Sequence, residues 1–252
     1  MSKQQSRDVE KRQVALVTGA SRGIGAAIAR RLASDGFTVV INYAGGEAEA
    51  TALASEIGRT GARALIAQAD VSDPKAVARL FDAAEAAFGG VDVLVNNAGI
   101  MKLAPLAESD DALVDRQIEI NLKGSLYTMR EAARRLRDGG RVINLSSSVV
   151  GLYLPSYSVY AATKAAIEAA THVLSKEMRG RNITVNAVAP GPTATDLFLN
   201  GKPQAVVDQL TKAAPLERLG RPEDIASTVS FLAGPDGAWI NGQVLRANGG
   251  IV

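Results

Sequence analysis

Residues 14–25 read VALVTGASRGIG, and this stretch decides the fold. It begins with four apolar residues typical of a buried strand and passes through a glycine turn into a helix that starts near Gly23. Gly19 can adopt a positive φ, and Gly23 and Gly25 have no Cβ, so a diphosphate can approach the backbone. The first amides of the helix and the positive end of its dipole then face that anion. The stretch therefore predicts a dinucleotide-binding turn.

The rest of the chain alternates between strand-like and helix-like segments. Apolar runs predict further strands at 37–41, 62–69, 91–95, 141–146, 182–188 and 243–247. Helical segments are predicted after the first helix at 47–60, 72–88, 110–137, 156–179 and 222–232. Such alternation implies right-handed crossovers between parallel strands. We expect an α/β Rossmann fold in one domain, with a doubly wound, seven-stranded parallel sheet and helices on both faces.

The composition limits the domain organisation and the class of protein. The chain has 252 residues, 47% of them hydrophobic, which suits one domain with one large core. We expect a flexible N-terminal tail at 1–10 and a single domain at 11–252. No stretch resembles a secretory signal or a membrane span, so we expect no membrane association.

The charge balance and the lack of cysteine exclude several kinds of site. The net charge is +2 and the basic residues are dispersed, so no nucleic-acid partner is expected. With no Cys and one His, neither a disulfide framework nor a usual zinc site can form, and we expect no metal. The lack of Cys is compatible with a reducing compartment, and we expect a cytoplasmic protein.

The end of the second strand indicates which nucleotide is bound. An acidic residue there commonly binds the ribose 2′-hydroxyl of NAD, but this chain has the neutral Asn42, and Glu47 lies further along. Arg22, inside the glycine turn, could pair with a 2′-phosphate. We therefore predict NADP(H) rather than NAD(H); the alternative is that Arg22 is only a solvated turn residue and that either cofactor is accepted.

Asp70 follows the third strand and has two possible roles. Its carboxylate could accept a hydrogen bond from the adenine amino group. It could equally form an Asx-type turn before Pro74.

Tyr160 and Lys164 are the candidates for acid/base chemistry. Their i,i+4 spacing in an Ala-rich helix places the phenol and the ammonium on one face. The phenol has a pKa near 10 in water, and a neighbouring cation favours the phenolate, so Lys164 is expected to lower the pKa of Tyr160. Ser147 lies 13 residues upstream and follows a strand, where a donor to a substrate carbonyl oxygen should stand.

Taken together, these motifs resemble the short-chain dehydrogenase/reductase family from end to end. The resemblance rests on TGASRGIG (18–25), Asp70-Val71, NNAG (96–99), Asn121, SSS (146–148), YAATK (160–164) and PGPTATD (190–196).

The resemblance implies a catalytic set of four residues. Tyr160 would donate or remove the proton, Ser147 would polarise the carbonyl, and Lys164 would lower the Tyr160 pKa and hold the nicotinamide ribose. Asn121, near a kink of the long helix at 110–137, would hold a water that links Lys164 to solvent. Ser146 and Ser148 remain alternatives to Ser147, which fits best both the interval to Tyr160 and the position after the strand.

The resemblance also implies the residues that hold NADP(H). Asn97 and Gly99 would border the adenosine side and Thr193 would meet the nicotinamide carboxamide. The full expected set is Gly19, Ser21, Arg22, Gly23, Ile24, Gly25, Asn42, Asp70, Val71, Asn97, Ala98, Gly99, Tyr160, Lys164, Pro190, Gly191 and Thr193.

A substrate flap is predicted at about 194–214. Its Leu197, Phe198 and Leu199 could line an apolar pocket with Met101, Leu103, Leu152, Tyr153, Leu154 and Tyr157. We expect an uncharged or hydrophobic ketone or aldehyde as the substrate. The family's 3-oxoacyl-carrier-protein reductases make a 3-oxoacyl thioester of carrier protein or CoA a further candidate. A basic face for an acidic carrier could come from Arg134, Arg135, Arg137, Arg179 and Arg181, although dispersed solvated charge is the more common explanation for such residues.

Two other functions remain open. The chain could work oxidatively, as an alcohol or sugar dehydrogenase, or it could be a non-catalytic NADP-binding sensor or scaffold. The resemblance also implies a homo-oligomer, either a dimer or a tetramer.

Overall fold

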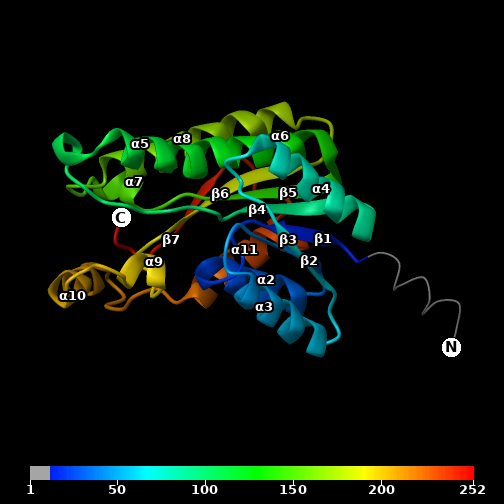
Figure 1. Cartoon of the computed structure of the whole chain (residues 1–252), viewed down its shortest axis with the longest axis horizontal. Coiled ribbons are helices and arrows are strands. Elements are labelled where there is room, and N and C mark those ends of the chain that lie inside the picture. Colours follow the sequence, from blue (N-terminus) through cyan, green and yellow to red (C-terminus); the bar gives the residue numbers. More distant parts are fainter. Residues whose placement is uncertain (1–11) are drawn as a thin grey trace, which may run out of the picture.

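A seven-stranded parallel sheet runs through the middle of the molecule (Figure 1). The computed structural model describes residues 12–252, and the expected tail at 1–10 lies outside them. The strand order is β3-β2-β1-β4-β5-β6-β7. The strands are β1 (Val14–Val17), β2 (Thr38–Tyr43), β3 (Ala64–Gln68), β4 (Val91–Asn96), β5 (Leu136–Leu145), β6 (Thr184–Pro190) and β7 (Val244–Ala247). The predicted doubly wound sheet is confirmed.

Helices cover both faces of this sheet (Figure 1). One face packs against α2 (Gly23–Ser34), α3 (Glu47–Arg59) and α11 (Pro222–Ala233), and the other against α4 (Pro74–Phe88), α6 (Ser125–Arg135) and α8 (Ser158–Glu177). Along β1, Ala15 and Val17 enter the first core, whereas Val14 and Leu16 enter the second. Because alternate side chains are buried on opposite faces, the central strands are continuously apolar in sequence.

The order of the strands reverses at β1. This strand pairs with β2 on one side and with β4 on the other. In such sheets a ligand binds beyond the carboxyl ends of the strands, at the point of reversal. The polar residues that follow β1, β4 and β5 therefore meet at one edge of the sheet.

The predicted helix at 110–137 is wrong at its end, and the kink expected near Asn121 is a π-helical segment. The predicted helix is divided into α5 (Asp111–Gln117), a π-helical segment η3 (Ile118–Gly124) and α6, and α6 ends at Arg135. Leu136 already pairs with Val91 as the start of β5. The guanidinium of Arg137 contacts the Asp92 carboxylate at 2.8 Å, which holds this segment against β4.

Short helices occupy loops for which the sequence predicts no regular structure. They are α7 (Val149–Leu152), α9 (Asp196–Leu199), α10 (Gln204–Ala213) and the 3-10 turns η2 (Leu106–Glu108) and η4 (Pro235–Gly237). The segment predicted as a flap thus carries α9 and α10. Within residues 12–252, no helix is both long enough and apolar enough to span a membrane.

Candidate active site

The glycine turn after β1 has the tight geometry that its sequence predicts. Gly19 and Gly23 adopt φ values of +60° and +56°, which side-chain-bearing residues rarely adopt. A Cβ on Gly25 would lie 2.4 Å from the Gly19 oxygen and 2.5 Å from Asn97 Nδ2. Asn97 Nδ2 in turn donates to the Gly19 oxygen at 3.0 Å. The turn therefore tolerates only glycine where it presses against the loop after β4.

A hollow of about 470 Å³ follows this turn along the edge of the sheet. It is lined by every residue predicted for the adenosine and diphosphate part of the cofactor: Gly19, Ser21, Arg22, Gly23, Ile24, Gly25, Asn42, Asp70, Val71, Asn97, Ala98 and Gly99. The amino end of α2 opens into it and Arg22 is exposed beside it. The glycine backbone, the amino end of α2 and the exposed guanidinium of Arg22 together suit the binding of a nucleotide that carries phosphates.

Asn42 lines the hollow, and its side chain holds the glycine turn in place. Its side chain is buried, with Oδ1 accepting from Gly19 N at 3.2 Å and Nδ2 donating to the carbonyl oxygens of Ala67 and Ala69. These bonds use the amide to hold the glycine turn against β3. The neutral side chain thus shapes the hollow and places no carboxylate in it.

Asp70 forms the Asx-type turn, and it has an additional partner. Its Oδ1 accepts from the backbone and hydroxyl of Ser72, at 2.9 Å and 2.7 Å, and its Oδ2 pairs with Arg116 at 3.1 Å. Burial alone would raise the pKa of Asp70, but these bonds lower it overall. Arg116 also lines the hollow, and no sequence motif had singled it out.

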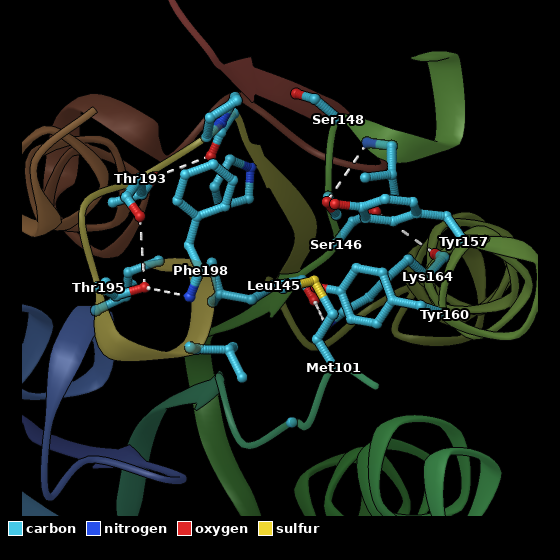
Figure 2. Close-up of a pocket in the computed structure, with 18 of the residues that line it drawn as sticks. Met101, Leu145, Ser146, Ser148, Tyr157, Tyr160, Lys164, Thr193, Thr195 and Phe198 are labelled. Atoms are coloured by element: carbon cyan, nitrogen blue, oxygen red, sulfur yellow. Dashed lines mark hydrogen bonds between the residues drawn. The ribbon is translucent and has the colours of Figure 1, made fainter. Parts of the chain in front are cut away.

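A second cavity, of about 120 Å³, begins where the hollow ends (Figure 2). Asn97, Gly99, Met101 and Ile24 line both. In Figure 2 Ser146, Ser148, Tyr157, Tyr160 and Lys164 gather on one side of this cavity, and Thr193, Thr195 and Phe198 on the other. The predicted Ser147, Pro190, Gly191 and Thr193 also line it. The residues predicted for the nicotinamide end of the cofactor therefore meet here.

Tyr160 is buried, and the Ser147 hydroxyl lies near enough to its phenol to influence the pKa. Burial raises the pKa of Tyr160 to about 12, since the phenolate would lose its hydration, while the Ser147 hydroxyl opposes that rise. The nearby phenol of Tyr157, whose ring centre lies 6.4 Å away, raises it further. At neutral pH Tyr160 is therefore a protonated acid.

Lys164 is buried beside Tyr160 but bonds elsewhere. Its Nζ lies 5.7 Å from the centre of the Tyr160 ring and donates to the Leu145 oxygen at 2.7 Å. Burial lowers the pKa of Lys164 to about 8. The expected lowering of the Tyr160 pKa by Lys164 is not seen: burial of the phenol raises that pKa, and the Lys164 ammonium bonds to the Leu145 oxygen. The sequence could not reveal how completely the site is shielded from water.

Asn121 lies in the π-helical segment η3, directly behind Gly99. Its Oδ1 accepts from Ile100 N at 2.8 Å, and its Nδ2 donates to the Ile100 oxygen at 2.9 Å. A Cβ on Gly99 would lie 3.2 Å from Asn121 Oδ1 and 3.8 Å from Lys164 Nζ. The amide and the ammonium thus flank one glycine. π-Helical turns are frequent at functional sites, and this one turns Asn121 inward.

The three serines have different partners. Ser146 Oγ donates to Glu168 Oε1 at 2.6 Å, and Ser148 Oγ donates to the Ala189 oxygen at 3.1 Å. Of the three serines, only Ser147 has a hydroxyl that lowers the pKa of Tyr160. This arrangement favours Ser147 over its neighbours as the donor to substrate.

The rest of the cavity wall is apolar, as predicted. Met101, Leu152, Leu154, Tyr157, Leu197 and Phe198 line it, joined by Leu210 of α10. Leu103, Tyr153 and Leu199 do not, and Tyr153 is 86% exposed. The segment at 194–214 therefore closes one side of the cavity through α9 and α10. Among residues 12–252, no group of acidic and histidine side chains is arranged to hold a metal.

The arginines considered as a basic face are largely neutralised. Arg135 contacts Asp82, Glu85 and Glu131, and Arg137 contacts Asp92. Arg134 and Arg181 pair with Glu131 and Asp138. Arg179 has no acidic partner among the described residues, whereas acidic side chains offset the charge of the other four arginines.

Comparisons with known proteins agree with this site. A family model described as enoyl-(acyl carrier protein) reductase matches residues 19–252. A short-chain type dehydrogenase/reductase of Picea abies is 48% identical over 250 residues, which cover 95% of this chain and 92% of that protein. The chain belongs to the short-chain dehydrogenase/reductase family.

The descriptions of several similar proteins name their cofactor. An NADPH-dependent aldehyde reductase-like protein of Arabidopsis thaliana, described as chloroplastic, is 44% identical, with 95% of this chain and 94% of that protein covered. A short-chain dehydrogenase from Burkholderia cenocepacia in complex with NADP superposes with a TM-score of 0.90 at 39% identity, covering 95% and 97% of the two chains. A blue fluorescent protein from a metagenomic library in complex with NADPH gives a TM-score of 0.91 at 39% identity, covering 95% and 98%.

Proposed function

We propose that this protein is an NADPH-dependent oxidoreductase that interconverts an apolar ketone or aldehyde and its alcohol, with Tyr160 as the general acid/base. One observation carries the proposal. A buried phenol, with a serine hydroxyl and a buried lysine beside it, stands in a largely apolar cavity that adjoins the hollow of the glycine turn. Its relatives include NADPH-dependent aldehyde reductases.

The cofactor is NADP(H), and the hollow fits it part by part. The glycine turn and the amino end of α2 hold the diphosphate, and Arg22 pairs with the 2′-phosphate. Asp70 and Arg116 lie where the adenine is expected. Pro190, Gly191 and Thr193 border the nicotinamide. When bound, the nicotinamide supplies or accepts the hydride.

The protein's own residues act on the carbonyl oxygen. Ser147 donates a hydrogen bond to that oxygen, where negative charge develops, and Tyr160 gives it a proton. Lys164 stabilises the resulting phenolate through its charge, and Asn121 connects this end of the site with a bound water. The apolar wall excludes other water, which strengthens each of these interactions.

The lining favours an uncharged substrate. Lys164 is the one charged side chain on the wall of the cavity among the described residues, and it already bonds to Leu145. A polar sugar would bury its hydroxyls against Met101, Leu154 and Phe198 without partners. A 3-oxoacyl thioester remains a candidate as a small molecule. Arg135 and Arg137 already pair with carboxylates of this chain, so they offer little attraction to an acidic carrier protein.

Assembly and location complete the proposal. We propose a homo-oligomer, either a dimer or a tetramer. We also propose that residues 11–252 form a single domain. The segment at 194–214 is proposed to move as a substrate flap. A cytoplasmic location stays a prediction, and two relatives are described as chloroplastic.

A substrate screen tests the function directly. Purified protein is assayed with NADPH against apolar aldehydes, ketones and 3-oxoacyl-CoA thioesters, and with NADP⁺ against alcohols and sugars. We expect reduction of an apolar carbonyl, lost in Tyr160→Phe while NADPH binding is kept, because the change removes the acid and leaves the hollow intact. Near-normal turnover by Tyr160→Phe would end the proposal. NADPH binding without turnover of any class would support a sensor instead.

A further inference from the structure

A carboxylate that the proposed chemistry does not use lies just behind the catalytic residues. Glu168 belongs to α8, one turn beyond Lys164 and two turns beyond Tyr160. It is partly buried, and its Oε1 accepts a 2.6 Å hydrogen bond from the buried hydroxyl of Ser146. That length is typical of a charge-assisted bond between a hydroxyl and a carboxylate.

We propose that Glu168 is a positioning residue: by holding Ser146, it fixes the loop at 146–148 to α8 so that Ser147 meets Tyr160. This inference rests on the proposed function, because it concerns the same serine and phenol. It assigns Glu168 no contact with substrate or cofactor.

The bonds of the loop explain why such a link is needed. The backbone amides of Ser146 and Ser148 donate to the oxygens of Val188 and Pro190, at 2.8 Å and 2.9 Å. Ser148 Oγ also binds on the β6 side, at Ala189. All these bonds tie the loop to β6. They do not set its distance from α8, which carries the phenol.

Links to α8 are fewer. Lys164 Nζ donates to the oxygen of Leu145, the residue before the loop, at 2.7 Å. Ser146 Oγ donates to Glu168 at 2.6 Å and also lies 3.5 Å from the Lys164 oxygen. Ser146 is thus the side chain adjacent to Ser147 that bridges β5 and α8. Further back along β5, Asn144 Nδ2 donates to Thr171 Oγ1 of α8 at 2.9 Å. Without Glu168, the Ser146 hydroxyl keeps only its 3.5 Å contact with the Lys164 oxygen, so the loop beyond Leu145 is held to α8 less firmly.

The position of Ser147 matters because, in the proposed reaction, its hydroxyl and the Tyr160 phenol act on the same carbonyl oxygen from one cavity. A displacement of about 1 Å can lower turnover by up to about 100-fold. The loop keeps its bonds to β6 and Lys164 keeps Leu145, so we expect a partial displacement and a smaller effect. A hydrogen-bond acceptor at position 168 should suffice, which distinguishes positioning from an effect of the negative charge on Tyr160 or Lys164.

Five variants test the inference: Glu168→Ala, Glu168→Gln, Ser146→Ala, the double variant with Glu168→Ala and Ser146→Ala and, as a matched control, Glu177→Ala. Glu177 lies on the same helix and is exposed. For each, kcat and KM for the best carbonyl substrate, the Kd of NADPH, the Tm and the pH profile of kcat are measured.

We expect kcat to fall about tenfold in Glu168→Ala and Ser146→Ala, with the Kd of NADPH within about twofold of wild type. Glu168→Gln should recover most of kcat with an unchanged pH profile, because the amide oxygen still accepts from Ser146. The double variant should be no worse than either single one, since both remove the same bond. Glu177→Ala should match wild type.

Two results would overturn the inference. One is a wild-type kcat in both Glu168→Ala and Ser146→Ala. The other is a Glu168→Gln variant as slow as Glu168→Ala with a shifted pH profile, which would make the charge the cause. If Glu168→Ala fails to fold, Ser146→Ala and Glu168→Gln decide the question. If one of these two results is obtained and Tyr160→Phe is inactive, only the role of Glu168 is overturned and the proposed function stands. An active Tyr160→Phe variant would overturn the proposed function itself.

Discussion

Replacing Gly25 by alanine should damage both folding and cofactor binding. The new methyl group would lie 2.4 Å from the Gly19 oxygen, 2.5 Å from Asn97 Nδ2 and 2.9 Å from the Ala20 Cα. Two of these neighbours are backbone atoms of the turn, and Asn97 is itself bonded to that turn. None of them is the free end of a flexible side chain, so α2 must move away from the turn.

The size of the effect follows from that geometry. Cβ atoms essentially never lie within 3.0 Å of such neighbours, so relief of the 2.4 Å contact requires a shift of at least 0.6 Å. Overpacking of this kind costs roughly 1–3 kcal/mol of unfolding free energy. The same shift moves the first amides of α2 away from the diphosphate. With each 1.4 kcal/mol equal to a factor of ten, we expect the Kd of NADPH to rise about tenfold or more.

Gly58→Ala is the matched control for this change. Gly58 lies inside α3, where an added Cβ would meet nothing within 4 Å, and its φ is not positive. In a helix, alanine is favoured over glycine by roughly 0.5–1 kcal/mol, so this variant should be slightly more stable than wild type. Urea unfolding and titration of NADPH fluorescence measure both quantities. A Gly25→Ala protein with wild-type stability and wild-type Kd would refute the argument that close approach requires glycine here.

Three other perturbations test other parts of the structure. Arg22→Ala should weaken NADPH binding and leave NADH nearly unaffected, since only NADPH carries the 2′-phosphate; equal loss for both, measured as kcat/KM, would contradict that role. Asp224→Asn should cost about 1 kcal/mol at pH 7 after allowing for screening by solvent, because the bond from Arg218 at 2.6 Å lowers the pKa of Asp224 to about 2 from 3.8. That stabilisation is present above pH 3.8 and lost as the pH falls through about 2, so urea unfolding of variant and wild type should converge near pH 2. Phe198→Ala should raise KM for apolar carbonyls several-fold with little change in NADPH affinity, because Phe198 lines the cavity from α9; an unchanged KM would place the substrate elsewhere.

The sequence predicted the sheet and both ends of the site because these depend on local patterns. Buried parallel strands require continuous apolar runs, and the glycine turn requires residues without Cβ, so both can be recognised in the sequence. The predicted helix at 110–137 extends past its actual end at Arg135, and the sequence does not show that its middle is π-helical. The π-helical turn at 118–124 leaves no signature in hydrophobic spacing. The start of β5 depends on a contact between Arg137 and Asp92, 45 residues apart.

Other features depend on three-dimensional neighbours. The three serines could be ranked by spacing alone, but their roles separate only when Glu168, Ala189 and Tyr160 are seen around them. Glu168 continues the i,i+4 series of Tyr160 and Lys164, so a signal for it was present in the sequence. Arg116 had none, because its link to Asp70 spans the end of β3 and α5.

The direction of the pKa shifts has a consequence for the chemistry. Burial raises the pKa of Tyr160 and lowers that of Lys164, so the site disfavours either charge taken singly. The same dry surroundings strengthen attraction between opposite charges, so a phenolate formed beside an ammonium is stabilised by its partner. In the proposed reaction the phenol would therefore stay protonated until hydride transfer made the carbonyl oxygen beside Ser147 basic enough to take its proton. An acid held in this form at neutral pH suits carbonyl reduction, and oxidation of an alcohol would first require that proton to leave a buried site.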